Sequence, residues 1–269
     1  MREHDMIAII GAGKMGEALV SGLLKAGKSP DDLLITERYE ARAQELTQRY
    51  GVKAVSNAEA AKTAETIVIA VKPQDMDSLL AELSSVVTPD RLIITIAAGI
   101  PTSAIEKRLV EGVPVVRVMP NTPALVGEAM SAVAGGAHAQ AHHLERAEDL
   151  FRPVGKVIRL PEGQLDAVTA LSGSGPAYVF YLVEAMTDAG ILLGLPRSVA
   201  HELIVQTVVG SAVMLRDSGE HPGILREAVT SPAGTTIAAI RELENHGVRA
   251  AFLSALEAAR DRSRELAQQ

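Results

Sequence analysis

The sequence predicts an α/β fold in which an N-terminal, doubly wound parallel sheet is followed by an all-helical region. Short apolar runs alternate with stretches of helical period as far as Leu160. A glycine-rich turn directly follows the first of these runs. After Pro161, long Ala-, Leu- and Val-rich stretches continue without a convincing pair of strands. We therefore place one domain at residues 1–161 and a second, helical domain at residues 162–269.

The first apolar run, Met6–Ile10, leads into a glycine motif that opens a helix. Gly11 allows the tight turn, Gly13 lets a pyrophosphate approach the backbone, and Gly16 lets the helix pack closely on the strand. Phosphate charge then rests at the helix N-terminus, where free amides and the helix dipole favour an anion. This context predicts a Rossmann-like, dinucleotide-binding domain. Its motif residues that contact the cofactor are Ile10, Gly11, Ala12, Gly13, Lys14, Met15 and Gly16.

The alternation that follows predicts the remaining elements of the first domain. Strands are expected at Asp32–Thr36, Thr66–Val71, Leu92–Ile96, Val115–Met119, Met130–Val133 and Lys156–Leu160. Helices are expected at Ala41–Tyr50, Ala58–Lys62, Asp75–Leu83, Ala141–Phe151 and from Thr102 onward. Gly51 closes the first of these helices as a left-handed cap, and Asn57 can cap the second. The β-branched run from Thr66 does not alternate, which is typical of a parallel strand covered on both faces.

Charged residues at the end of the second strand bear on the identity of the cofactor. Glu37, 21 positions beyond Gly16, could accept the adenosine ribose hydroxyls, as in NAD sites. Arg38 and Arg42 could instead hold a 2′-phosphate, as in NADP sites. These two interpretations conflict, and a solvated, charged helix start is a third. Glu37 and Arg38 are therefore both candidate contacts, to NADH or to NADPH.

Residues that directly follow parallel strands face the ligand crevice of a doubly wound sheet. Lys72 is a candidate neighbour of the ribose or nicotinamide, although a lysine merely leaving a sheet is nearly as common. The small residues 97–99 would let a flat cofactor lie against the backbone. Asn121, between two prolines, could hydrogen-bond a carboxamide, or the stretch could be a rigid turn. The further cofactor candidates are Asn57, Ala70, Val71, Lys72, Pro73, Ala97, Ala98 and Gly99.

Composition narrows the classes of partner. The chain has 269 residues, a formal net charge of -7 and no cysteine. The acidic balance disfavours nucleic acid, and the absence of cysteine excludes disulfides and thiolate metal sites. No signal peptide precedes the glycine turn, so we expect a cytoplasmic protein with a small-molecule partner. The apolar stretch Ala177–Leu195 contains Glu184, Asp188 and two glycines, so we interpret it as a buried helix and not as a membrane span.

The second domain has two features of its own. The helix from Ala177 is apolar nearly all round, which predicts a tight homo-oligomer. Two glycine-rich helix starts, at residues 171–178 and 230–237, present backbone amides that can bind a carboxylate. Hydroxyls of Ser231, Thr235 and Thr236 add donors at the second start, although ordinary capping would explain either motif alone.

At these residues the sequence resembles the pyrroline-5-carboxylate reductases, which reduce a cyclic imine to L-proline in the last step of proline biosynthesis. The matching stretches, in order and spacing, are residues 10–16, 70–73, 119–126, 173–178 and 231–237. The resemblance implies NADPH as the cofactor, with NADH as an alternative. It also implies a helical domain that interlocks into a homodimer, often within a decamer of five dimers. The substrate site would take its nicotinamide from the other subunit, and its residues would be Val229, Ser231, Gly234, Thr235 and Thr236, with Asn121 as a further candidate.

The chain departs from the family pattern at two positions, where Ala233 and Ala129 replace glycines. At positive φ, Ala233 would strain the substrate loop by roughly 1 kcal/mol or more. The site has no His or Asp pair because a basic imine needs little help beyond one hydroxyl or water donor. Thr236 is the catalytic candidate, and we expect it to orient the imine nitrogen, since a threonine hydroxyl is a poor acid.

Two other functions compete with this one. A related imine or 3-hydroxy-acid reductase would share the architecture. The hydroxy-acid enzymes, however, generally rely on a lysine in the helical domain, and this chain has none after Lys156. A non-catalytic protein that senses NADP would not need the second hydroxyl-rich helix start.

Overall fold

The computed structural model describes residues 5–266. Residues 1–4, where no signal peptide is expected, lie outside the described residues. The packing of the chain defines two compact units. The first contains the described residues up to Ser174 and those from Ala259 onward, and the second is Gly175–Ala258. Each unit is described by itself.

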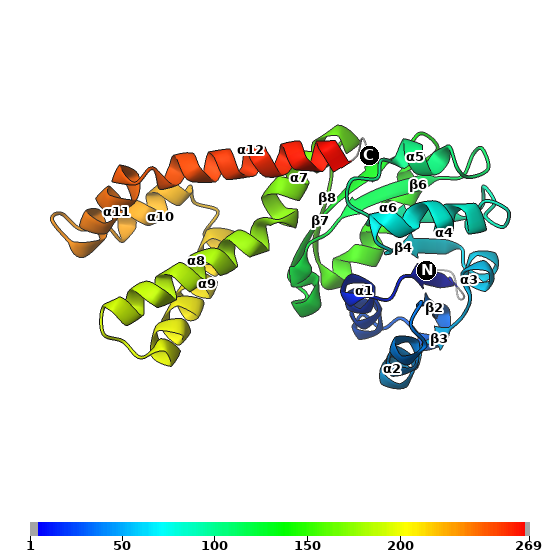
Figure 1. The fold of residues 1–269 in the computed structure, drawn as a ribbon, viewed down its shortest axis with the longest axis horizontal. Coiled ribbons are helices and arrows are strands. Elements are labelled where there is room, and N and C mark those ends of the chain that lie inside the picture. Colours follow the sequence, from blue (N-terminus) through cyan, green and yellow to red (C-terminus); the bar gives the residue numbers. More distant parts are fainter. Residues whose placement is uncertain (1–4, 267–269) are drawn as a thin grey trace. The chain divides into compact units, whose positions relative to one another are not determined.

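The first unit is built on one sheet with the strand order β3-β2-β1-β4-β5-β6-β7-β8 (Figure 1). Its strands are β1 (Ile7–Ile10), β2 (Leu33–Thr36), β3 (Lys53–Ala54), β4 (Thr66–Ile69), β5 (Leu92–Thr95), β6 (Val115–Met119), β7 (Ala129–Gly135) and β8 (Gly155–Arg159). Neighbours from β3 to β6 run parallel, whereas β7 is antiparallel to β6 and parallel to β8. The order reverses between β1 and β4, which defines the switch point where such sheets bind ligands.

Helices cover both faces of this sheet, as the sequence predicts. Alternate residues of β1 enter different cores: Ile7 and Ile9 pack in one, Ala8 and Ile10 in the other. The first core also contains the helices Lys14–Lys25, Glu40–Tyr50 and Ala141–Phe151, and the second contains the helices Asn57–Thr63, Met76–Leu83 and Thr102–Glu106. The described strands β1, β2, β4 and β5 are buried along their whole length, which explains their continuous apolar sequence.

The helices of the first unit agree closely with the expected ranges. They are α1 (Lys14–Lys25), α2 (Glu40–Tyr50), α3 (Asn57–Thr63), α4 (Met76–Leu83), α5 (Thr102–Glu106), α6 (Ala141–Phe151) and α7 (Leu165–Val168). Short 3-10 turns are η1 (Pro30–Asp32), η2 (Pro73–Asp75), η3 (Thr122–Val126), η4 (Arg152–Val154) and η5 (Glu162–Gln164), and η6 (Thr169–Gly173) is a π-helix. Gly51 ends α2 at φ 73°. The expected cap at Asn57 is wrong: Ser56 is the N-cap of α3, its hydroxyl accepting from the Glu59 amide at 3.2 Å.

The second unit is helical and strongly apolar. It contains α8 (Gly175–Leu192), α9 (Arg197–Ser218), α10 (Pro222–Ala228), α11 (Thr235–Asn245) and α12 (Val248–Leu266) as far as Ala258. α8 and α9 pack closely where Gly190 meets Ala200, since a side chain at position 190 would lie 2.7 Å from the Ala200 Cβ.

The expectation that Ala177–Leu195 is a buried helix is wrong for a single chain. In α8, only Thr187 and Gly190 are buried, and Phe180 and Tyr181 are 67% and 75% exposed. Among the described residues one helix, α9, has the length and apolar composition to cross a membrane. The apolar side chains of α8 and α9 are too many for one chain of so few helices to cover.

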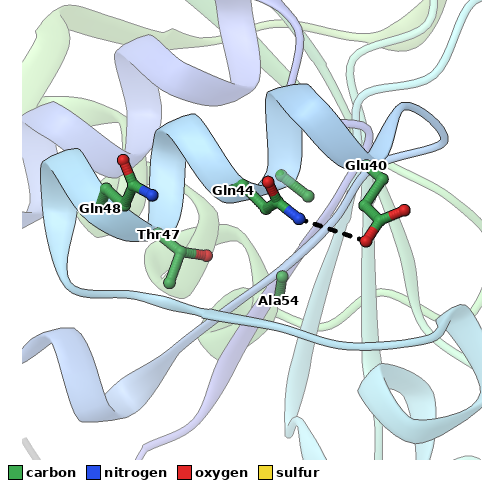
Figure 2. Close-up of a pocket in the computed structure, with 6 residues that line it drawn as sticks. Glu40, Gln44, Thr47, Gln48 and Ala54 are labelled. Atoms are coloured by element: carbon green, nitrogen blue, oxygen red, sulfur yellow. Dashed lines mark hydrogen bonds between the residues drawn. The ribbon is translucent and has the colours of Figure 1, made fainter.

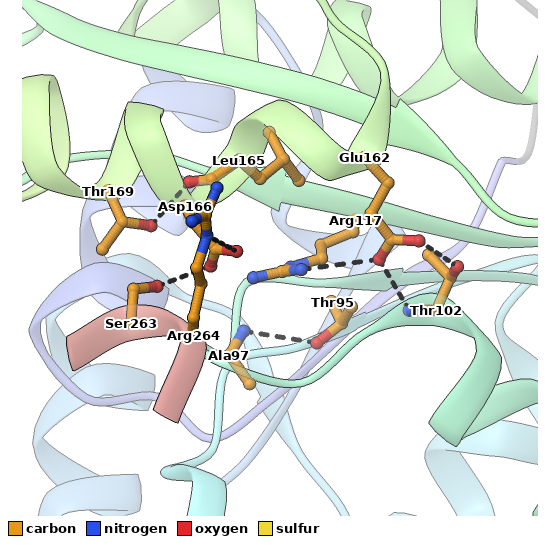
Figure 3. Close-up of polar contacts among 10 residues, drawn as sticks. All are labelled: Thr95, Ala97, Thr102, Arg117, Glu162, Leu165, Asp166, Thr169, Ser263 and Arg264. Atoms are coloured by element: carbon orange, nitrogen blue, oxygen red, sulfur yellow. Dashed lines mark hydrogen bonds and ion pairs between the residues drawn. The ribbon is translucent and has the colours of Figure 1, made fainter. Parts of the chain in front are cut away.

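The packing boundary differs from the predicted boundary at residue 161. α7 and η6 pack with the first unit, and so does the last part of α12. Ser263 on α12 is buried and donates a hydrogen bond from its hydroxyl to Asp166 of α7 at 2.7 Å (Figure 3). The predicted boundary between residues 1–161 and 162–269 lies just after the last strand of the sheet. This division into two domains stays a prediction.

Candidate functional site

The glycine motif lies at the switch point of the sheet and is tied to both neighbouring strand ends. The Gly11 amide donates to the Thr36 carbonyl at 3.0 Å, and the Ala70 amide donates to the Ile10 carbonyl at 2.8 Å. Gly11 has φ 91°, and a side chain there would lie 2.9 Å from the Ala70 backbone. Only glycine therefore allows the ends of β1 and β4 to approach this closely.

The surroundings of the other two motif glycines, Gly16 and Gly13, differ from each other. A side chain at Gly16 would lie 2.5 Å from the Gly11 carbonyl oxygen, so Gly16 brings α1 close to the turn, as predicted. A side chain at Gly13 would meet no protein atom within 4 Å. Within the described residues, nothing in the protein itself requires glycine at this position, so the open space beside Gly13 fits a bound group.

The start of α1 is suited to an anion. Gly13 is its N-cap and has an extended backbone, and no described side chain caps the helix. The Glu17 amide donates to the Gly13 carbonyl at 2.8 Å, and the preceding amides of the first turn have no acceptor within the helix. Together with the space beside Gly13, these amides fit the pyrophosphate of a dinucleotide.

The end of β2 carries the residues predicted to meet the adenosine half of a dinucleotide. Glu37 turns one carboxylate oxygen onto the backbone amides of Arg38 and Tyr39, at 2.8 and 3.2 Å. The Arg38 side chain is exposed and has no partner in the described chain. Arg42 is engaged on both sides, by ion pairs to Glu17 and Glu45.

Glu17 is a further candidate residue at this end of the sheet, and it was not among the predicted site residues. It follows Gly16 directly, and its side chain is 15% exposed. Burial raises the pKa of Glu17, but hydrogen bonds from Arg42 and Tyr50 and the charges of Arg42 and Arg49 outweigh burial, so that the pKa is lowered below 4.5. The available signal was an acid in the first turn of the helix after the glycine motif.

The ends of β4 and β5 carry the remaining cofactor candidates. The carboxyl edge of the sheet, where the candidates after β1, β2, β4 and β5 lie, is called the cofactor edge below. The register of these strands places Ile69 opposite Thr95, so the residues that follow each strand are neighbours. Ala70 and Val71 are half-buried, and Lys72 and Pro73 are exposed. In the following loop Ala97 is buried, Ala98 is exposed, and Gly99 has φ 75°, which favours glycine.

Two candidates have their side chains occupied by contacts within the chain. The Asn57 amide donates to Glu82 at 2.9 Å. Asn121 donates to the Ser172 carbonyl at 3.0 Å and accepts from the Met130 amide at 2.9 Å. Asn121 thus joins the start of β7 to the π-helix η6, and both ends of its amide hold the fold. A role of Asn121 in binding substrate stays a prediction.

A charge cluster with a buried arginine lies at the start of α5. Arg117, in the middle of β6, is 5% exposed and lies 3.5 Å from Glu162 (Figure 3). Glu162 also accepts from the Thr102 amide and hydroxyl, at 2.8 and 2.7 Å, and so caps α5. These contacts were not predicted from the sequence, although an arginine inside the apolar run of β6 was a signal for them.

A surface hollow of about 320 Å³ lies against edge strand β3 and the adjoining face of α2 (Figure 2). Its lining is Glu40, Ala43, Gln44, Thr47, Gln48 and Ala54. Gln44 donates to Glu40 at 3.2 Å across its rim. The hollow is two strands away from β1 and holds none of the predicted site residues, so it is separate from the cofactor edge.

The predicted substrate loop, residues 229–236, joins α10 to α11 in the second unit. Its centre is a turn, Ser231–Gly234, closed by the Gly234 amide donating to the Ser231 carbonyl at 3.1 Å. Pro232 is second in this turn, and Ala233 is third, at φ 55°. A type II turn has this arrangement and favours glycine in third place. Ala233 is the one non-glycine residue with positive φ in the described chain. The backbone strain that was expected if Ala233 had a positive φ is therefore present.

The start of α11 carries free donors. A side chain at Gly234 would lie 2.3 Å from the Ser231 hydroxyl, so glycine makes room for that hydroxyl. Thr235 and Thr236 are the first two residues of α11, whose N-terminus no side chain caps. Across the described chain, the hydroxyls of Ser231, Thr235 and Thr236 have no hydrogen-bond partner. Val229, at the end of α10, is 63% exposed beside them.

The structure therefore brings the predicted residues together in two groups. The cofactor candidates lie at the carboxyl edge of the sheet in the first unit, and the substrate candidates lie at the α10–α11 loop in the second. Asn121 is the exception, since this substrate candidate lies in the first unit. The first group can bind a dinucleotide, and the second can bind a small anion through amides and hydroxyls.

Two family models match this chain, one in its N-terminal part and one in its C-terminal part. A family model described as pyrroline-5-carboxylate reductase dimerisation matches residues 162–266. A model described as NADP oxidoreductase, coenzyme F420-dependent, matches residues 6–99.

Relatives with matching sequence span nearly the whole chain. A pyrroline-5-carboxylate reductase of Corynebacterium melassecola is 47% identical over 97% of this chain and 98% of its own. One of Methanosarcina acetivorans is 45% identical over 98% of each.

Solved structures agree with the sequence relatives. The chain superimposes on a pyrroline-5-carboxylate reductase of Coxiella burnetii with a TM-score of 0.93 and 36% identity, over 99% of this chain and 100% of that one. A Plasmodium falciparum pyrroline carboxylate reductase with NADP bound gives a TM-score of 0.89 at 29% identity, over 98% and 99%.

Proposed function

Because the chain belongs to the pyrroline-5-carboxylate reductase family, we propose that its cofactor lies along the carboxyl edge of the sheet and its substrate on the α10–α11 loop. The protein is an oxidoreductase that reduces 1-pyrroline-5-carboxylate to L-proline with NADPH, in proline biosynthesis. The proposal concerns which residues of this chain perform that reaction.

On the cofactor side, the amides at the start of α1 bind the pyrophosphate beside Gly13. Arg38 meets the 2′-phosphate, since its guanidinium is exposed and unpaired in the described chain. Lys72 and the small residues 97–99 border the nicotinamide end of the crevice. NADPH, when bound, supplies the hydride that reduces the imine carbon.

On the substrate side, the uncapped start of α11 and the Ser231 and Thr235 hydroxyls bind the carboxylate. Thr236, half-buried, orients the imine nitrogen, which takes up a proton from water as the carbon is reduced. Val229 packs against the apolar ring edge. The observation that carries this assignment is the set of three hydroxyls around the start of α11 that have no hydrogen-bond partner among the described residues.

The protein forms a homo-oligomer, because the matched dimerisation region includes the apolar helices α8 and α9. We propose that the partner chain covers these helices, so that α9 does not enter a membrane, and that five dimers can form a decamer. We further propose that the enzyme works in the cytoplasm and does not bind nucleic acid, given its net charge of -7.

The test is a comparison of Thr236→Val with Thr236→Ser, measured by NADPH absorbance with 1-pyrroline-5-carboxylate. Loss of the hydroxyl in Thr236→Val should lower kcat by about tenfold or more, and Thr236→Ser should retain most of it. The KM for NADPH should be the same in both variants. Equal activity of Thr236→Val and the wild type would contradict the role of Thr236, and absence of turnover in the wild type would contradict the function itself.

A further inference from the structure

Arg42 and Arg38 lie four residues apart near the start of α2, but their surroundings differ. Arg42 donates to Glu45 at 2.8 Å through one terminal nitrogen and to Glu17 through the other. Its side chain is 26% exposed. Arg38 is exposed, and its side chain contacts no acidic group of the described chain. Only one of these two guanidinium groups is therefore free to meet a ligand.

Glu17 is the group that restrains Arg42. The Glu45 side chain is 54% exposed, and an exposed ion pair of this kind is weak. Glu17 is more buried and is fixed by two further donors, Arg49 and the Tyr50 hydroxyl, each at 2.9 Å. These donors hold the Glu17 carboxylate in place, so that Arg42 is drawn toward α1.

We propose that Glu17 sets the preference between NADPH and NADH, by holding Arg42 away from the 2′-phosphate and leaving Arg38 as the cation that meets it. This inference rests on the proposed placement of the cofactor. A second arginine at the phosphate would favour NADPH more strongly, since a 2′-phosphate accepts charge-assisted hydrogen bonds that a ribose hydroxyl cannot match. The Glu17–Arg42 pair thus keeps the preference moderate and leaves NADH usable.

The test uses ligands that undergo no reaction. Binding of adenosine 2′,5′-bisphosphate and of adenosine 5′-monophosphate is measured by calorimetry for the wild type and Glu17→Gln. Release of Arg42 should tighten the bisphosphate by about two- to fivefold, the size of an exposed ion pair, and leave the monophosphate unchanged. The ratio of kcat/KM for NADPH to that for NADH should rise by the same factor.

Three further variants make the result specific. Arg42→Ala alone should leave the affinity for the bisphosphate unchanged, because Arg42 does not reach it in the wild type. Adding Arg42→Ala to Glu17→Gln should abolish the gain. Glu45→Gln, which releases Arg42 only on its exposed side, should have little effect.

The inference is overturned if Glu17→Gln changes both ligands equally, if the gain survives Arg42→Ala, or if Arg42→Ala alone weakens the bisphosphate. A separate control addresses the cofactor placement on which it rests. Arg38→Ala should weaken the bisphosphate and not the monophosphate. If it weakens neither, the placement of Arg38 in the proposed function is wrong, whatever Glu17 does.

Discussion

Gly11 and Ala70 approach so closely at the switch point that a side chain on Gly11 would lie 2.9 Å from the Ala70 carbonyl carbon and oxygen. Gly11→Ala should therefore strain the ends of β1 and β4, at φ 91° and against a rigid backbone. We expect the free energy of unfolding to fall by about 1–3 kcal/mol, measured by denaturant titration. NADPH binding should weaken as well, because the turn carries the amides at the start of α1.

Gly13→Ala tests whether glycine at this position is needed for cofactor binding or for the stability of the fold. A side chain there meets no protein atom within 4 Å, so the free energy of unfolding should stay within about 0.5 kcal/mol of the wild type. The KM for NADPH should nevertheless rise about tenfold or more if the pyrophosphate passes beside this residue. Gly163→Ala, also in open space but outside the cofactor edge, should change neither quantity. An unchanged KM in Gly13→Ala would place the pyrophosphate elsewhere.

Ala233→Gly should stabilise the protein, against the usual effect of introducing glycine. Relief of the positive φ of 55° outweighs the added entropy of glycine in the unfolded chain, with an expected net gain of about 0.5–1 kcal/mol. The matched control is Ala238→Gly inside α11, which should lose about 0.5–1 kcal/mol. If both variants lose stability alike in thermal unfolding, the turn at Ala233 is not strained.

Much of the first unit follows from the sequence because local and tertiary forces agree there. The range of α6 is the expected one, and Gly51 ends α2 where a left-handed cap was expected. The two-residue strand β3 was missed because it is exposed and has no apolar pattern. The antiparallel direction of β7 was missed too. The direction of a strand depends on the path of the segment that connects it to the preceding strand, and the period of the hydrophobic residues does not encode that path.

The pH dependence of stability should report on Glu17. Its pKa is lowered below 4.5 in the folded protein by Arg42, Tyr50 and Arg49, against the opposing effect of burial. A carboxylate whose pKa is lower in the folded than in the unfolded protein stabilises the fold at a pH above the unfolded-state pKa. This contribution is lost as the pH falls through the folded-state pKa. The stability difference between the wild type and Glu17→Gln should therefore be constant at a pH well above the ordinary pKa of glutamate and should shrink as the pH falls through that value toward the lowered folded-state pKa. A difference that is independent of pH down to acid unfolding would show that the Glu17 charge is not involved.

For the site, the sequence predicts which residues gather but not which side chains are already occupied. Arg38 and Arg42 are equivalent candidates in the sequence, and the ion pair with Glu17 separates them, from a helix 25 residues earlier in the chain. Asn121 is likewise a reasonable donor until its amide is seen to join Ser172 and Met130. Such pairings depend on how elements distant in sequence pack, and no local pattern encodes them.

The last prediction concerns a site shared between chains. Because the cofactor candidates and the substrate loop lie in different units of the chain, two lesions can be placed far apart in sequence. Gly13→Asp should preserve α1, since aspartate is a favourable N-cap, while its charge repels the pyrophosphate. Thr236→Val removes the orienting hydroxyl. Each variant alone should retain about a tenth of the wild-type activity or less.

Co-expression of Gly13→Asp and Thr236→Val chains should restore activity if the loop of one chain serves the cofactor of its partner. In a hybrid dimer one site then carries both lesions and the other carries neither, so a random mixture should reach about one quarter of the wild-type specific activity. If each site is built from a single chain, every site in the hybrid keeps one lesion and the mixture stays inactive. Hybrids isolated with two different affinity tags and verified by mass should show about half of the wild-type activity under sharing. Activity no higher than that of the parents would contradict the shared site.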